Sequence, residues 1–319
     1  MKKAIITGAT GFIGSVLAKH LTENSVDVIA LGRRNFDDVS EMVKNNLKQS
    51  KYLQIEMEDI ENLEENLKQL GWDAGKDCVF FNLAWGGIEK LSDLDIDAQM
   101  KNISQAVSAI EISKKIGCSK FLQIGTMEEA FTHRYLQLDF HKNNEYNRHV
   151  IYSVAKIAAK NALFVRSAEI GIDFIYVLHS HVMGPGDDKD SFLQVTLEKL
   201  INGDELIFSS GHQYFDVISP FDCANGYFLI GKKGVSRSEY WVGSGNPRPL
   251  REYVEEMYQL YPSQEPMKFG EMPYNDIVLT PSDFSIENLT NDTGYLPSQT
   301  YEQIVHNLYK SIVSEGSRN

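Results

Sequence analysis

The stretch YSVAK places a phenol and an amine four residues apart, at Tyr152 and Lys156, within a helical pattern. Side chains at this spacing lie on the same face of a helix. A phenol titrates near pH ~10 and is a poor base at neutral pH, but a neighbouring ammonium stabilises the phenolate and lowers its pKa. The pair therefore has the chemistry of a proton-transfer centre, although such pairs also occur by chance on helix surfaces.

Three glycines recur at every third position in ITGATGFIG, at Gly8, Gly11 and Gly14, between an apolar run and a helical pattern. Glycine allows a sharp turn and lets the backbone approach a pyrophosphate closely. The free N–H groups and the positive dipole end of a helix N-terminus attract phosphates. The loop therefore predicts a dinucleotide site, and a glycine turn without a ligand is the alternative.

Short apolar runs alternate with helical patterns through the first half of the chain. The runs are KAIIT, DVIALG, YLQIE, CVFFNLAW, KFLQIGT and IDFIYVL, and long helices are expected near 95–116 and 150–170. This rhythm predicts an α/β fold, a Rossmann-type doubly wound parallel sheet, over residues 1–178. The elements become shorter after that point. A smaller C-terminal α/β substrate lobe is expected over 179–319, with a segment near 212–243 returning to the first domain.

Composition narrows the classes of partner. The net charge of −13 argues against nucleic acid, whose phosphates would be repelled. The chain has no apolar run long enough for a membrane span, and its first apolar run is too short for a secretory signal. Three cysteines far apart indicate neither disulfides nor a metal site, so a cytoplasmic protein is expected. The histidines at 133, 141 and 149 are interpreted as loop residues rather than zinc ligands.

Several ordered motifs together resemble one family. TGATGFIG resembles the cofactor loop of the extended short-chain dehydrogenases/reductases, the NAD(P)-dependent epimerase/dehydratase superfamily. YSVAK matches its Tyr-x-x-x-Lys, NLAW its fourth-strand end and MGPG its Gly-Pro after the sixth strand, while DFSIENLTNDTGYLP resembles its closing segment. The resemblance covers nearly the whole chain and implies an enzyme that modifies nucleotide-linked sugars.

The cofactor contacts implied by the resemblance and the loop form one set. It consists of Gly8, Thr10, Gly11, Phe12, Ile13, Gly14, Arg33, Arg34, Asp59, Ile60, Leu83, Ala84, Trp85, Asn102, Tyr152 and Lys156. A dinucleotide fold usually carries an acidic residue at the end of its second strand to hold the ribose 2′-hydroxyl, but Gly32 stands there. Arg33 and Arg34 follow and suit a 2′-phosphate. NADP is therefore predicted, with NAD and a merely basic loop as the alternatives.

The resemblance also implies the roles in the reaction centre. Tyr152 would be the acid/base, Lys156 would orient the ribose and lower the pKa of the phenol, and Thr126 would bind the reacting oxygen. In Thr126-Met127-Glu128 the chain keeps the glutamate of the 4,6-dehydratases and lacks their aspartate. Glu128 is a candidate base, although it and the equally acidic Glu129 could also be a helix start or surface charges.

The chain departs from the family where the substrate is held. His181 stands where relatives have asparagine before the Gly-Pro, and Phe215 stands where many have an arginine that grips the diphosphate. Arg248, with Arg251, could supply positive charge instead, although both could equally be solvated surface arginines. His181 and Arg248 are the candidate substrate contacts.

These observations lead to one functional prediction with alternatives. We expect an NADP(H)-dependent oxidoreductase of a nucleotide-linked sugar, a 4-keto-sugar reductase. The end of the second strand suits NADP(H), and NADP(H) suits a reaction in which the reductant dissociates from the enzyme. An epimerase or a 4,6-dehydratase with Glu128 as base is the enzymatic alternative, and a non-catalytic NADP(H)-binding sensor is the alternative of another class. The family implies a homodimer through the helices near 95–116 and 150–170.

Overall fold

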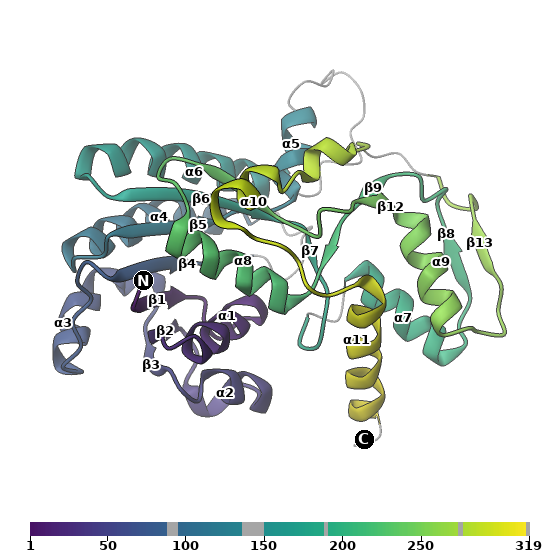
Figure 1. Cartoon of the computed structure of the whole chain (residues 1–319), viewed down its shortest axis with the longest axis horizontal. Helices are drawn as coiled ribbons and strands as arrows, with labels where there is room; N and C mark the ends of the chain where they lie inside the picture. The colour runs from purple at the N-terminus through teal and green to yellow at the C-terminus, as the bar shows by residue number, and fades with distance from the viewer. Residues whose placement is uncertain (88–94, 136–149, 188–190, 274–276, 317–319) are drawn as a thin grey trace.

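The computed structural model describes residues 1–87, 95–135, 150–187, 191–273 and 277–316. Its centre is a seven-stranded sheet in the order β11-β6-β5-β4-β1-β2-β3 (Figure 1). The bounds are β1 Lys3–Thr7, β2 Asp27–Gly32, β3 Lys51–Gln54, β4 Cys78–Asn82, β5 Lys120–Ile124, β6 Asp173–His179 and β11 Glu239–Val242. Every neighbouring pair is parallel. The predicted Rossmann-type doubly wound sheet is confirmed.

Helices cover both faces of the sheet, which explains why its strands read as continuous apolar runs. On one face lie α1 (Phe12–Glu23), α2 (Glu41–Leu47), α8 (Pro220–Lys233) and α10 (Glu287–Thr293), whose apolar side chains share one core. The other face is covered by α3 (Leu63–Gln69), α4 (Ile96–Lys115) and α6 (Val150–Ile170), which enclose a second core. The short helix η1 (Phe36–Asp38) follows β2, η2 (Met57–Asn62) follows β3, and α5 (Glu128–Tyr135) follows β5.

A third core lies at the carboxyl-terminal side of the sheet, between α7 (Phe192–Asn202), α9 (Leu250–Leu260) and α11 (Tyr301–Gly316) (Figure 1). Short strand pairs accompany these helices: β7 (His181–Val182) with β10 (Val217–Ile218), β8 (Leu206–Phe208) with β13 (Met267–Phe269), and β9 (Tyr214–Phe215) with β12 (Arg248–Pro249). The short helix η4 (Pro281–Phe284) precedes α10.

The segment near 212–243 is divided between the two parts. Its first strands, β9 and β10, pair within the lobe, whereas α8 packs on α1 and β11 completes the sheet beside β6. The domain limits drawn from the sequence stay a prediction. In the part of the chain that the structure describes, none of the helices is long and apolar enough to cross a membrane.

The sheet order sets the location of the site. Strands β1 and β4 are neighbours, and the chain leaves them toward opposite sides of the sheet. In open α/β sheets, ligands bind outside the carboxyl ends of the strands at such a switch point. The glycine loop follows β1, and the residues after β4 and β5 border the same crevice.

Candidate active site

The glycine loop between β1 and α1 is packed so tightly that side chains are excluded. Gly8 has φ +68°, a conformation that favours glycine, and a Cβ on Gly14 would lie 2.2 Å from the Gly8 carbonyl oxygen. Gly11 is the N-cap of α1 and has no side chain to accept the first N–H groups, and the first turn contains no acidic residue. The loop therefore leaves amide donors and a positive dipole end for a pyrophosphate, so this part of the site fits a dinucleotide.

A row of buried polar side chains crosses the carboxyl ends of β1, β4 and β5. The Thr7 hydroxyl donates to Asn82 Oδ1 at 2.6 Å, and Asn82 Nδ2 donates to Gln123 Oε1 at 2.7 Å. The same hydroxyl oxygen accepts the backbone N–H groups of Leu83 and Ala84, both at 3.1 Å. These bonds hold the loop after β4 against the glycine loop, because Gly8 packs directly on the Leu83–Ala84 backbone.

The next residues of this loop are held by two amides of α4. The Asn102 side chain makes two hydrogen bonds to the Gly86 backbone. Its Oδ1 accepts from the Gly86 N–H and its Nδ2 donates to the Gly86 carbonyl, each at 2.9 Å. Gln99, which is buried, donates to the Gly86 and Gly87 carbonyls and accepts from Trp85 Nε1 at 2.8 Å. Asn102 therefore positions the loop, and a direct contact of Asn102 with a cofactor stays a prediction.

Thr126, Tyr152 and Lys156 come together at the end of β5. Both α6 side chains are buried, and the Lys156 ammonium donates to the Ile124 carbonyl at 2.9 Å. The Thr126 side chain lies close enough to the Tyr152 phenol to lower its pKa. Trp85 lies against both α6 side chains. Its ring centroid is 4.0 Å from Lys156 Nζ and 6.4 Å from the centroid of the Tyr152 ring, which it meets edge to face. The structure thus brings a hydroxyl, a phenol and an amine into one buried cluster.

Burial shifts both titrating groups of this cluster toward their neutral forms. Desolvation lowers the pKa of Lys156 to about 7, and the negative charge of Glu129 acts in the opposite direction. Desolvation likewise raises the pKa of Tyr152 above its usual value. The Thr126 side chain opposes this shift, and the charges of Glu128 and Glu129 increase it. The phenol therefore holds its proton at neutral pH, and the centre is poised as an acid.

The two adjacent acidic residues at the start of α5 differ in environment. Glu128 is half-buried, and its backbone N–H donates to the Thr126 hydroxyl oxygen at 3.3 Å. Glu129 is fully buried behind the centre, where it accepts from the Thr126 N–H at 3.0 Å and from the Tyr176 hydroxyl at 2.6 Å. The predicted base Glu128 therefore lies beside the centre, and Glu129 belongs to its support.

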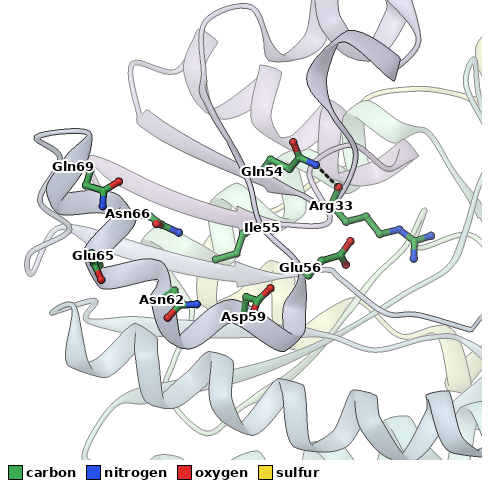
Figure 2. A pocket seen from close by; sticks show the side chains of 9 residues that line it. All are labelled: Arg33, Gln54, Ile55, Glu56, Asp59, Asn62, Glu65, Asn66 and Gln69. Carbon is green, nitrogen blue, oxygen red and sulfur yellow. Dashed lines mark hydrogen bonds between the residues drawn. The ribbon is translucent and has the colours of Figure 1, made fainter.

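A pocket of about 700 Å³ lies beside the carboxyl ends of β2 and β3 (Figure 2). It is lined by Arg33, Gln54, Ile55, Glu56, Asp59, Asn62, Glu65, Asn66 and Gln69, of which only Arg33 is cationic. Gln54 Nε2 donates to the Arg33 carbonyl at 3.0 Å and fixes that backbone. Arg33 and Asp59, two predicted cofactor residues, thus border one cavity.

Two other predicted residues of this region lie outside that cavity lining. Arg34 is exposed and its carbonyl accepts from the Tyr52 hydroxyl at 2.5 Å. Ile60 is fully buried in the apolar core, so a contact from it to a cofactor would have to come from its backbone.

The candidate substrate residues are placed in the lobe. His181 lies in β7 with its ring 5.3 Å from that of Phe215, and burial lowers its pKa to about 4, so the ring is neutral. Its Nε2 is buried and has no partner among the described residues. Arg248 is already engaged, donating to Glu256 at 2.7 Å and stacking over Tyr253 at 4.3 Å. The lobe thus offers one free imidazole nitrogen, while Arg248 is held inside it.

Of the three histidines interpreted as loop residues, at 133, 141 and 149, the structure describes only the first. Residues 141 and 149 lie outside the described residues, and His133 is exposed on α5. Among the residues that are described, no group of three histidine, cysteine or acidic side chains is arranged to hold a metal ion.

The comparison with protein families agrees with this geometry. The model of the NAD dependent epimerase/dehydratase family matches residues 4–243, three quarters of the chain. The chain belongs to this family. It is therefore an enzyme of the NAD dependent epimerase/dehydratase family, as the motifs predicted, and it carries the tyrosine and the lysine of that family's Tyr-x-x-x-Lys in a buried centre.

Individual members of the family resemble the chain over nearly its full length. CDP-abequose synthase of Salmonella typhimurium is 23% identical over 316 residues, covering 97% of each chain. Among solved structures, the UDP-N-acetylglucosamine 4-epimerase of Methanobrevibacter ruminantium, in complex with UDP-N-acetylmuramic acid, superposes with a TM-score of 0.78 at 18% identity over 98% of this chain and 99% of the other. The dTDP-glucose 4,6-dehydratase of Bacillus anthracis, in complex with NAD, has a TM-score of 0.75 at 17% identity over 99% and 98%.

Three residues of this family member's site were not found by sequence reasoning. Gln99, Gln123 and Tyr176 are buried polar side chains whose partners lie far away in the sequence. Gln99 and Gln123 offered one signal, because each is a polar residue on the inward face of an otherwise apolar helix or strand. Tyr176 offered none, because a tyrosine in an apolar strand is ordinary.

Proposed function

We propose that this enzyme acts on carbon 4 of a nucleotide-linked hexose and transfers a proton there through Thr126, Tyr152 and Lys156. The observation that carries the proposal is the buried cluster of these side chains, in which Thr126 lowers the pKa of the Tyr152 phenol. Bound NAD or NADP supplies a nicotinamide that accepts or returns a hydride. The glycine loop and the bare N-terminus of α1 would hold its pyrophosphate.

Each residue of the centre has its own role in the proton transfer. Tyr152 exchanges a proton with the sugar oxygen on carbon 4, and the Thr126 hydroxyl shares that hydrogen bond. Lys156 in its ammonium form stabilises the phenolate when the proton has left Tyr152. Trp85 covers the lysine and keeps water from it, since their separation is 4.0 Å. The cluster can act as an acid or a base, depending on the direction of the reaction.

Relatives support epimerisation or dehydration as the net reaction, in which the hydride returns to the same sugar. For dehydration, Glu128 is the candidate base beside the centre. Met127, where the dehydratases carry an aspartate, packs against the apolar core and supplies no acid. Epimerisation needs no such acid, so the side chains of this loop favour it over dehydration.

A 4-keto-sugar reductase is the second candidate, and the end of β2 favours it. A Cβ on Gly32 would lie 2.7 Å from both Thr10 Cγ2 and the Tyr52 hydroxyl, and the chain has no carboxylate at this position to hold a ribose 2′-hydroxyl. Arg33 borders the adjoining pocket and matches a 2′-phosphate. We therefore propose NADP(H) as the cofactor, which suits a reductant that exchanges in every turnover.

The lobe would hold the nucleotide sugar. His181 Nε2, buried and unpartnered among the described residues, would bind the substrate from β7. Arg248 would need to leave Glu256 to reach a diphosphate, so it is the weaker candidate. We also propose a cytoplasmic homodimer through α4 and α6, whose outer faces expose apolar side chains such as Met100 and Val165.

The test is conversion of a panel of nucleotide-linked hexoses and their 4-keto forms, with NAD and with NADPH, followed by nicotinamide absorbance and product mass. An isomer without net cofactor change, or loss of water, identifies the epimerase or dehydratase. Oxidation of one NADPH for each 4-keto sugar consumed identifies the reductase. If no member of the panel is converted or bound, the proposal is wrong.

A further inference from the structure

Glu129 is a buried carboxylate directly behind the proton-transfer centre. Its side chain is 1% exposed, and one oxygen, Oε1, accepts from the Thr126 N–H at 3.0 Å and the Tyr176 hydroxyl at 2.6 Å. A Cβ on Gly125 would lie 2.5 Å from this oxygen and 2.7 Å from the Tyr176 hydroxyl. A glycine before Thr126 is therefore what lets the carboxylate reach the loop.

The second oxygen of Glu129, Oε2, is turned toward the lysines of α6. It has no hydrogen-bond partner among the described residues, and Lys160 Nζ lies 3.8 Å away. Lys160 also pairs with the half-exposed Glu239 of β11 at 2.8 Å. Lys156 stands one helical turn before Lys160, and its interaction with Glu129 is electrostatic.

Such a carboxylate is expensive as a packing residue. Burying a charge costs on the order of several kcal/mol unless hydrogen bonds and opposite charges offset it. An apolar side chain would fill the same space without that cost. Desolvation raises the pKa of Glu129, while the Tyr176 hydroxyl, the two lysines and the Thr126 amide favour its charged form. Tyr176 and Lys160, behind the centre, give the larger part of this compensation, and Lys156 and Thr126 of the centre give the rest.

We propose that Glu129 is a positioning residue, which fixes the Thr126 backbone with one carboxylate oxygen and presents its negative charge to the lysines of α6. The inference rests on the proposed function of Thr126, Tyr152 and Lys156. The charged and titrating groups that face this carboxylate are Tyr152, Lys156 and Lys160 of α6, Tyr176 of β6, its neighbour Glu128 and, beyond Lys160, Glu239.

The charge of Glu129 acts on both titrating groups in the same direction. It favours the ammonium of Lys156 and disfavours the phenolate of Tyr152, so it raises the pKa of each. Removal of this charge should therefore move both titrations to lower pH, and the pH profile of activity should follow. A residue that only packs would lower stability and leave these midpoints where they are.

The experiment compares the full-length protein with Glu129→Gln, which keeps shape and removes charge. The titration of Lys156 is followed by NMR in protein with nitrogen-labelled lysine, its signal assigned by its loss in Lys156→Arg. We expect Glu129→Gln to lower the Lys156 midpoint on the order of one pH unit. The matched control is Glu239→Gln, the other carboxylate on Lys160, which should leave the midpoint unchanged. Glu129→Asp, which keeps the charge, should restore most of the difference.

The outcomes separate this inference from the proposed function. A lowered midpoint in Glu129→Gln and a normal one in Glu239→Gln support the inference, whether or not a sugar substrate has been found. An unchanged midpoint in folded Glu129→Gln overturns it and leaves the proposed reaction intact. If Glu129→Gln does not fold, Glu129→Met takes its place, because it removes the charge and fills the same space with an apolar side chain; a Lys156 midpoint equal to that of the wild type in this variant overturns the positioning role.

Discussion

Replacing Lys156 by methionine separates what this lysine costs the fold from what it does in the reaction. The side chain is buried, and desolvation lowers its pKa from the usual 10.5 to about 7. A shift of this size means that the charged amine destabilises the folded state by about 5 kcal/mol. Methionine removes that cost but leaves the Ile124 carbonyl without its donor, which costs about 2 kcal/mol. The net expectation is a protein about 3 kcal/mol more stable than the wild type.

The pH dependence of this gain follows from the two pKa values. Below about pH 7 both the folded and the unfolded wild type carry the ammonium, and the full cost is present. Between about pH 7 and 10.5 only the unfolded state keeps the proton, so the stability of the wild type rises with pH and the advantage of Lys156→Met shrinks. Above that range the ammonium is lost from both states and its contribution ends.

The assay is urea unfolding of both proteins at about pH 6, 8 and 10, together with turnover. Lys156→Met should lose activity by at least about 100-fold while gaining stability at the lower pH values. Lys68→Met is the control, because Lys68 is exposed and pairs only on the surface, and its stability should change by less than about 1 kcal/mol at any pH. If Lys156→Met is less stable than the wild type near pH ~6, or if the difference in stability does not narrow with rising pH, the buried ammonium does not carry the cost assigned to it.

Three further changes test other parts of the site. Gly14→Ala puts a Cβ 2.2 Å from the Gly8 carbonyl oxygen. We expect a loss of about 1–3 kcal/mol in stability, measured by urea unfolding, and at least about tenfold weaker NAD(P) binding, measured by nucleotide fluorescence. An affinity equal to that of the wild type would contradict the assignment of the glycine loop as the pyrophosphate site. Arg33→Ala should weaken NADPH binding by about tenfold and leave NADH binding unchanged, because a charge-assisted pair is lost; an equal effect on both would exclude the 2′-phosphate contact. With a sugar that loses water, Glu128→Gln should slow dehydration by about 100-fold or more while hydride transfer persists, and unaltered dehydration would show that Glu128 is not the base.

The sheet and the core of the site were predictable because their signals are local. A buried parallel strand reads as a short apolar run, and the glycine loop needs only three residues at fixed spacing. The helices expected near 95–116 and 150–170 correspond to α4 (Ile96–Lys115) and α6 (Val150–Ile170). Tyr152 and Lys156 share a helix face by their spacing alone, so their proximity did not depend on the rest of the fold.

The remaining features depend on contacts between distant segments. Glu128 and Glu129 look alike in the sequence, and only the direction in which α5 leaves β5 makes one half-buried and the other a partner of Tyr176. The lobe strands contain two or three residues and owe their existence to pairing across the chain, so no periodicity reveals them. Arg248 is a different case, because its partners Glu256 and Tyr253 lie within eight residues of it, but the sequence does not show that they turn toward it from the first turns of α9.

The role of Tyr152 is tested by a single turnover of a nucleotide-linked sugar by the wild type and by Tyr152→Phe. The variant keeps the buried ring and removes only the hydroxyl that meets Thr126. Both proteins should bind cofactor and sugar alike, and the step at carbon 4 should slow by about 100-fold to 10,000-fold in the variant. A variant that transfers hydride at the rate of the wild type would contradict the assignment of Tyr152 and, with it, the proposed reaction centre.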